Sequence, residues 1–191
     1  MEGIKNWWNG FVEKHPALAK WIREGGLFVV VSNLITVFKY IILTFLPLAF
    51  ASLGSQAFGW PNIELTIGGK TFPWMVIGYG AEQGGLAYFT AYMVAMVIGE
   101  VINFPIQKFV VFQNKDLGKT LAKQIIWYII AFCVITVIVN SINCIWVAVA
   151  QDVWGVPNWL YNIVTVVMNG GVSMVIFFFV NKIIFPETKK N

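Results

Sequence analysis

Lys39 and Glu100 are charged residues inside two long apolar runs, 26–50 and 86–111. A charge in a membrane-spanning segment costs at least about 2.5 kcal/mol, so such a residue usually faces a partner or a polar cavity. Counted from the same membrane face, Lys39 lies about 20 Å deep and Glu100 about 12 Å deep. Helical side chains lean toward their own N-terminus, which brings these two together if the helices are antiparallel. The sequence therefore predicts a Lys39–Glu100 ion pair.

Amide side chains lie near this pair in the predicted helices. Asn33 is close to the depth of Glu100, and Asn103 and Gln107 continue the Glu100 face at i+3 and i+7. The third apolar run adds Asn140. These amides can line a polar groove, or they can act as polar contacts between helices, and the sequence leaves both interpretations open.

Further polar residues mark the ends of the apolar runs. Lys108 and Lys182 occupy matching positions at the cytoplasmic ends of the second and fourth runs, Asn181 precedes Lys182, and Arg23 precedes the first run. Anchoring by the positive-inside rule would explain the basic residues without any binding role. Alternatively, they form a shallow basic ring that captures the phosphate or pyrophosphate of a lipid.

The residue types of metal, redox and nucleophilic sites are sparse. Cys133 and Cys144 lie in one run, about 16 Å apart along a helix, which is too far for a disulfide. The single histidine, His15, is in the N-terminal segment. No nucleophile–base pair, metal cluster or phosphate-binding loop is visible, so we expect no cofactor, no metal and no enzymatic activity.

The composition identifies the elements that must position these residues. Hydrophobic residues make up 58% of the 191 residues and charged residues 12%, and the mean hydropathy is +0.72. A soluble domain of this composition would expose too much apolar surface. A helix needs roughly 20 apolar residues to cross a bilayer. We therefore predict an all-α integral membrane protein with four transmembrane helices, at about 26–50, 86–111, 124–150 and 159–184.

The predicted domain organisation has three parts. Residues 1–24 form an amphipathic interfacial segment, residues 25–185 the four-helix transmembrane domain, and residues 186–191 a cytoplasmic tail. The apolar face of the first part follows helical spacing and suits a helix lying in the membrane interface; it consists of Ile4, Trp7, Trp8, Phe11 and Val12.

The basic residues predict the orientation. Of the thirteen Lys and Arg residues, all but Lys39 and Lys70 lie in the N-terminal segment, the link between runs two and three, or the tail. Both termini are therefore predicted to be cytoplasmic. The long outer link, residues 51–85, contains "IELTIGGKTF", in which Gly68-Gly69 predicts a two-residue hairpin turn.

The two halves of the chain resemble each other. "LAKWI" at 18–22 returns as "LAKQI" at 121–125, "ITV" at 35–37 returns at 135–137, and "QKFVVF" at 107–112 is echoed by "NKIIF" at 181–185. Their order and positions predict two repeated helix pairs, parallel about an axis along the membrane normal. Transporters often place a substrate path at such an interface.

From Trp21 to Phe185 the chain resembles the GtrA family of small four-span membrane proteins. The first run opens at Gly26 and reaches Thr36, and the second carries Asn103-Phe104, Lys108 and Val111-Phe112. The fourth follows Pro157 and ends in Asn181-Lys182 with Phe185. The chain departs from the family pattern at Lys39, where an acidic or neutral residue is expected, and in the longer link 51–85.

The resemblance implies translocation of a polyprenyl-phosphate-linked sugar across the bacterial cytoplasmic membrane, for cell-envelope polysaccharide or teichoic acid glycosylation. The expected binding residues would meet the phosphate first and then hydrogen-bond the sugar; they are Arg23, Asn33, Lys39, Glu100, Asn103, Gln107, Lys108, Asn140, Asn181 and Lys182. Lys39 would receive the phosphate midway or neutralise Glu100.

Two other functions compete with this one. The chain could be a membrane adaptor that supports a glycosyltransferase without transporting, with the Trp-rich outer link as its docking surface. A proton-coupled exporter of cationic drugs is less favoured, because it needs an unpaired carboxylate and Lys39 is close to Glu100. The expected partners are the sugar lipid, membrane lipids, a glycosyltransferase and a second copy of the chain, with no nucleic acid.

Overall fold

The computed structural model describes residues 2–81, 84–157, 160, 163–164, 167–186 and 188. Its helical elements are α1 (Glu2–Lys14), α2 (Pro16–Ala49), the 3₁₀ turn η1 (Ala51–Leu53), α3 (Gly85–Pro105), the π-helix η3 (Ile106–Val111), α4 (Lys119–Ala148), the π-helices η4 (Val149–Val153) and η5 (Val167–Val172), and α6 (Ser173–Ile184). The strands are β1 (Phe58–Trp60), β2 (Ile63–Ile67), β3 (Lys70–Trp74) and β4 (Ile77–Tyr79).

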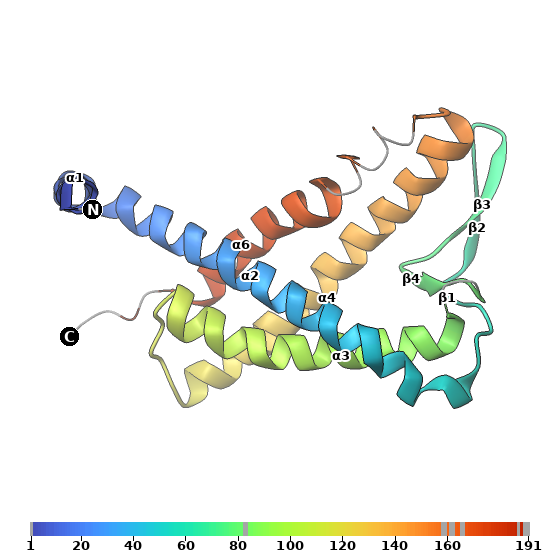
Figure 1. Cartoon of the computed structure of the whole chain (residues 1–191), viewed down its shortest axis with the longest axis horizontal. Helices are drawn as coiled ribbons and strands as arrows, with labels where there is room; N and C mark the ends of the chain where they lie inside the picture. Colours follow the sequence, from blue (N-terminus) through green and yellow to red (C-terminus); the bar gives the residue numbers. More distant parts are fainter. Residues whose placement is uncertain are drawn as a thin grey trace.

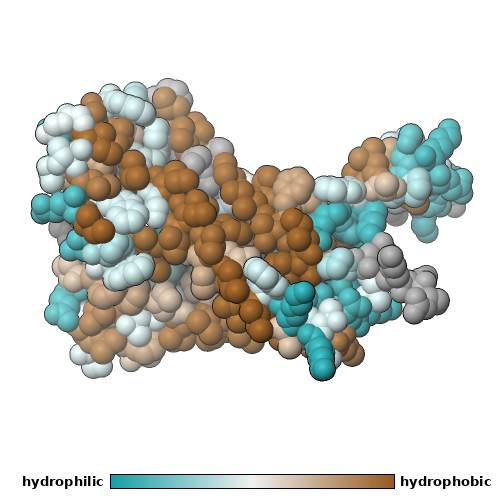
Figure 2. Space-filling view, turned by 180° about the vertical axis from the view of Figure 1, so that it is seen from behind, coloured by the Kyte–Doolittle hydropathy of each residue, from teal (hydrophilic) through white to brown (hydrophobic). Residues whose placement is uncertain are grey.

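The chain is a multi-pass membrane protein. Three helical stretches in the described residues are long and apolar enough to cross a membrane: Pro16–Ala49, Gly85–Val111 and Lys119–Trp146. A shorter apolar helix, Gly170–Ile184, covers the second half of the predicted fourth span. Part of the first half of that span, including Trp159, lies outside the described residues. Large apolar side chains are exposed along the bundle, where Figure 2 shows a continuous hydrophobic surface.

The N-terminal segment divides differently from the predicted boundary at residue 24. α1 ends at Lys14, and α2 begins at Pro16. Proline at the first turn of a helix loses no hydrogen bond, and it keeps the preceding residue, His15, out of the helical conformation. α2 is therefore about 50 Å long, and its first turns extend beyond the predicted start of the span. α1 crosses its direction (Figure 1).

α2 and α3 form the first helix pair. α3 presents a row of small residues at every fourth position, all buried: Ala87, Ala91, Ala95 and Gly99. In a membrane, helices associate through close van der Waals packing, for which small residues let the backbones approach. α4 and α6 form the second pair. Helices thus pair within each half of the chain, while the internal duplication itself stays a prediction.

The two ends of the molecule differ (Figure 1). We call the end that carries α1, the 112–118 link and the last turn of α6 the basic end. The other is the hairpin end, where α4 diverges from α2 and α3 and the strands lie between them (Figure 1).

The predicted hairpin is confirmed. β2 and β3 pair in antiparallel register from Ile63↔Trp74 to Ile67↔Lys70. Gly68 and Gly69 have φ values of 59° and 78°, which a tight two-residue turn requires and which glycine adopts without steric cost. Phe72 of β3 packs on Val149, and this contact fastens the hairpin to the far end of α4. A second short ladder, β1 with β4, extends the hairpin and was not predicted.

An aromatic cluster fills the basic end of the bundle. Its buried rings are Phe28, Phe112, Tyr128 and Phe185, with Phe104 and Phe178 packed on them. Phe112 and Phe185 are 2% and 1% exposed. Pro105 interrupts the α-helical ladder because it has no N–H, and the chain continues as the π-helix η3 up to Val111. The aromatic cluster joins α2, α3, α4 and α6 to the end of η3.

Replacing Phe112 by alanine is expected to lower the free energy of unfolding by about 3–5 kcal/mol, because the ring is buried among other rings and its removal leaves a cavity. Phe45→Ala is the control, since Phe45 is 67% exposed on α2; its expected change is below about 1 kcal/mol. Unfolding in mixed detergent with increasing dodecyl sulfate measures both. Equal losses would show that the aromatic cluster does not hold the helices together.

Candidate functional site

The predicted Lys39–Glu100 ion pair is present. Lys39 Nζ lies 2.6 Å from Glu100 Oε1, and the two side chains are 17% and 18% exposed. The pair joins α2 to α3, which run antiparallel (Figure 1). Each charge therefore has an opposite charge in a site where water reaches only part of the side chains, which lowers the cost of placing both inside a span.

The other oxygen of Glu100 has two further donors. The Tyr128 hydroxyl donates to Glu100 Oε2 at 2.7 Å, and Asn103 Nδ2 lies 3.2 Å from the same oxygen. Asn103 Nδ2 also donates to the Tyr128 hydroxyl at 2.9 Å, and Gln107 Nε2 donates to Asn103 Oδ1 at 3.2 Å. The predicted face Glu100–Asn103–Gln107 thus forms one hydrogen-bonded chain. We call Lys39, Glu100, Asn103 and Tyr128 the charged network.

Tyr128 was missed by the sequence analysis. It lies in a long apolar run of α4 and is 6% exposed. A phenol in a span usually finds a hydrogen-bond partner, so a tyrosine near the start of the third run was the available signal. Its contribution is to attach α4 to the carboxylate that already joins α2 and α3.

Gly99 makes room for Lys39. A Cβ added to Gly99 would lie 2.0 Å from Lys39 Cε and 2.9 Å from its Cγ. The lysine side chain therefore runs directly over the α3 backbone on its way to Glu100. The sequence carries no signal for this role, because a glycine in an apolar run does not show which side chain crosses it.

The charged network forms part of the wall of a cavity of about 460 Å³. Every span supplies polar residues to this wall: Ser32, Thr36 and Lys39 from α2; Tyr92, Glu100 and Asn103 from α3; Thr136, Asn140 and Asn143 from α4; and Ser173 and Asn181 from α6, beside Gly170 of η5. Apolar residues such as Met96, Phe132 and Phe177 complete it. A volume in this range suits a small ligand, and the mixed lining suits one with both hydroxyl groups and charge.

Three tyrosines lie beside the cavity toward the hairpin end. The ring of Tyr79 is 4.8 Å from that of Tyr88 and 5.7 Å from that of Tyr92, measured between centroids. Burial raises the pKa of Tyr79 above its usual value. Its hydroxyl therefore stays protonated at neutral pH.

Asn33 does not belong to this site. Its side chain is exposed, and its Nδ2 donates to the Val29 carbonyl of its own helix at 2.8 Å. The prediction that Asn33 lines the groove is wrong. Its depth along α2 was predicted correctly, but its side chain lies on the outer face of the helix. Ser32 and Thr36, on the inner face, line the cavity instead.

Lys108 was predicted to meet the phosphate first, at the cytoplasmic mouth of the groove, but the structure does not place its side chain at an exposed mouth. Its side chain is fully buried. Nζ donates to Gln124 Oε1 at 2.6 Å and to Asn114 Oδ1. Asn114 in turn donates to the Pro186 carbonyl. Lys108 therefore ties the 112–118 link and the C-terminus to the bundle, since the π-helix η3 turns it inward together with Gln107 and Val111.

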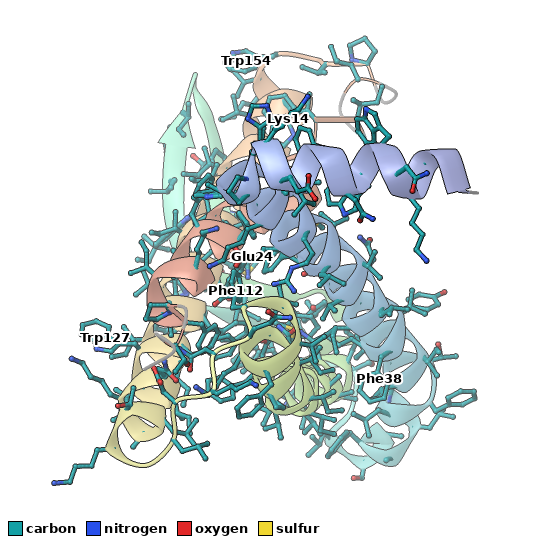
Figure 3. All side chains as sticks on the ribbon, turned by 90° about the vertical axis from the view of Figure 1, so that its left-hand side faces the viewer. Lys14, Glu24, Phe38, Phe112, Trp127 and Trp154 are labelled. Atoms are coloured by element: carbon teal, nitrogen blue, oxygen red, sulfur yellow. The ribbon has the colours of Figure 1, made fainter. Side chains whose placement is uncertain are left out.

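Lys182 is also engaged within the protein. Nζ lies 2.5 Å from Glu24 Oε2 and 3.5 Å from the centroid of the Trp21 ring. Glu24 is 2% exposed and was not singled out by the sequence analysis. Figure 3, seen from the basic end, shows Glu24 and Phe112 in the middle of the bundle. This second ion pair joins α2 to α6.

The other predicted residues divide between cavity and surroundings. Asn140 and Asn181 line the cavity. Gln107 reaches the charged network through Asn103 but is not in the cavity wall. Arg23 is half-buried and lies outside the wall. Of the ten predicted residues, the structure thus brings Lys39, Glu100, Asn103, Asn140 and Asn181 into one cavity wall.

Gly99→Ala is expected to displace Lys39, weaken the ion pair with Glu100 and lower the free energy of unfolding by about 1–3 kcal/mol, because the new methyl group overlaps the lysine side chain. Gly26→Ala is a matched control, since it lies in α2 with no atom near an added Cβ. That substitution should be neutral or slightly stabilising. Unfolding midpoints of the two variants check this, and a Gly99 variant as stable as the Gly26 variant would contradict it.

The comparison with protein-family models matches residues 70–185 to the GtrA/DPMS transmembrane domain. The match covers more than half of the chain, including α3, α4 and α6 with most of the cavity wall, and it begins within the hairpin. No match was found among curated proteins or among solved structures. With its spans paired around one polar cavity, this chain belongs to the GtrA/DPMS transmembrane family.

Proposed function

We propose that this protein translocates a polyprenyl-phosphate-linked sugar across the bacterial cytoplasmic membrane. The observation that carries the proposal is the cavity of about 460 Å³, to which every span contributes hydroxyl or amide groups and which holds one ion pair. The family membership supports a role in handling lipid-linked sugars. The isoprenoid chain stays in the bilayer while the sugar and phosphate pass through the cavity.

The charged network provides a means of holding the phosphate in this proposal. Lys39 is the cation of the cavity wall, and Glu100 is its present partner. If a phosphate replaces Glu100 as the partner of Lys39, the carboxylate keeps the Tyr128 hydroxyl and the Asn103 amide as donors. Glu100 then remains hydrogen-bonded without its ion pair, so the exchange costs less than leaving a bare buried charge.

The amides of the cavity wall would bind the sugar. Asn103, Asn140 and Asn181 come from three different helices and face the same cavity. An amide both donates and accepts hydrogen bonds, so it matches a sugar hydroxyl in either role. Thr136 and Ser173 add hydroxyl groups at the same wall.

The adaptor function is the second candidate, because aromatic residues are exposed at the hairpin end. Trp60 is 60% and Trp154 is 66% exposed, and such residues are frequent anchors of protein interfaces. In this case Lys39 and Glu100 would be a structural pair, and a glycosyltransferase would dock on the hairpin end. A pull-down with the Trp60→Ala variant separates this function from transport.

Substitution of Lys39 by methionine should reduce sugar-lipid scrambling in proteoliposomes at least about tenfold, the equivalent of one charged hydrogen bond to the phosphate. Asn140→Ala should reduce it less, because a neutral hydrogen bond is weaker. Asn33→Ala is the control, being a polar residue of α2 outside the cavity. Scrambling unchanged in well-folded Lys39→Met protein would exclude the proposed path, and none in the wild type would favour the adaptor.

Both termini are placed in the cytoplasm in this proposal. In a protein whose Cys133 and Cys144 are replaced by serine, a cysteine at Lys115 should react with a membrane-impermeant maleimide only after cell lysis. A cysteine at Lys70, in the hairpin turn region, should react in intact cells. Both side chains are exposed, so the reagent reaches them from whichever side they face. The reversed pattern would contradict the orientation.

A further inference from the structure

A second hollow lies between α4 and α6 on the outside of the bundle. Its volume is about 630 Å³, and its wall is formed mainly by Trp127, Ile130, Val134, Val180 and Ile183. Trp127 and Ile183 are 53% and 78% exposed, and Figure 3 shows Trp127 at the outer edge. We call this hollow the α4–α6 groove.

The basic end of the α4–α6 groove is polar and positively charged. Thr120, Lys123 and Gln124 complete its wall there. Lys119, exposed, lies one turn before Lys123 on the same helix. The groove is thus an apolar channel along two spans with a hydroxyl and an ammonium group at one end.

A buried charge lies directly behind this polar end. Gln124 accepts a hydrogen bond from Lys108 Nζ at 2.6 Å, and among the described residues no carboxylate lies within 4.0 Å of that nitrogen. Its two acceptors are the neutral amides of Gln124 and Asn114. The Asp116 carboxylate acts on this ammonium only from beyond ion-pair distance. The positive potential that remains favours an anion on the other side of the wall.

We propose that the α4–α6 groove binds a polyprenyl monophosphate, with the phosphate against Lys123 and Thr120 and the first isoprene units along Trp127, Ile130, Val134 and Ile183. The groove is one seam between two helices, which suits a single chain better than the two chains of a phospholipid. The inference rests on the proposed function and adds to it a site for the carrier lipid that is distinct from the polar cavity.

The groove and the cavity share the walls α4 and α6. On α6, Val180 lines the groove and its neighbour Asn181 lines the cavity. On α4, Ala131 lines the groove and its neighbour Phe132 lines the cavity. Phe132 packs on Phe177 at 6.2 Å between centroids. A carrier held in the groove would therefore have its head group one helix pair away from the polar cavity, on the side of the aromatic cluster.

The test is binding of sugar-free polyprenyl monophosphate to the full-length, delipidated protein in detergent, measured by native mass spectrometry. Ala131→Trp fills the groove from within, and Ile129→Trp places the same large side chain at an exposed position of α4 outside it. Lys123→Ala and Lys119→Ala form a second matched pair, because both remove one charge but only Lys123 is in the wall.

We expect at least about tenfold weaker binding for Ala131→Trp and Lys123→Ala, and wild-type binding for Ile129→Trp and Lys119→Ala. Undiminished binding by monodisperse Ala131→Trp protein would overturn the proposal, as would equal displacement by phosphatidylglycerol. Because this probe has no sugar and nothing is transported, the result is independent of scrambling. Binding that is intact in a wild type without scrambling would refute the proposed transport and leave the groove site standing.

Discussion

The hydrogen bonds of the Glu100 carboxylate are the interaction on which this membrane domain depends most. One oxygen is paired with Lys39 of α2, and the other accepts from Tyr128 of α4 and Asn103 of α3. In a bilayer the hydrophobic effect does not hold apolar helices against one another, so close packing and polar contacts carry the association. A single charged group that needs three donors from three helices fixes both their register and their rotation. The small residues of α3 allow this arrangement. At Gly99 there is no side chain, so Lys39 can cross the helix backbone to reach Glu100.

The two ends of the bundle differ in how they are held. At the basic end, the aromatic cluster packs tightly. The Glu24–Lys182 pair joins α2 to α6, and the buried Lys108 joins η3 to α4 and to the 112–118 link. At the hairpin end the helices diverge, and the hairpin is fastened to α4 through Phe72 and Val149 (Figure 1). The polar cavity lies between a tightly packed end and a splayed one. A head group that moves through it would have to displace side chains mainly at the basic end.

The lysines of this chain have different roles in the structure. Lys39 faces the cavity, Lys182 neutralises Glu24, Lys108 is buried among amides, and Lys123 borders an apolar groove. Of these four, Lys39 alone lies in the wall of the polar cavity. The positive-inside rule counts Lys108, Lys123 and Lys182 alike, because it describes where lysines lie relative to the membrane and carries no information about their neighbours.

The sequence by itself determined the elements and the family. The length of the apolar runs identified the spans, and Gly68-Gly69 identified the hairpin turn. The opposite directions in which Lys39 and Glu100 lean predicted their ion pair. Each of these features depends only on local chain geometry or on one helix pair. Tertiary structure decided which face of a helix is inside. Asn33 is at the predicted depth, but its side chain points outward. Tyr128 and Glu24 bind charged partners that the sequence did not predict for them. Lys108 lies in the π-helix that follows Pro105 and is turned into the interior. Nearly all-apolar helices have little hydrophobic periodicity, so rotation about the helix axis could come only from the packing of all four spans.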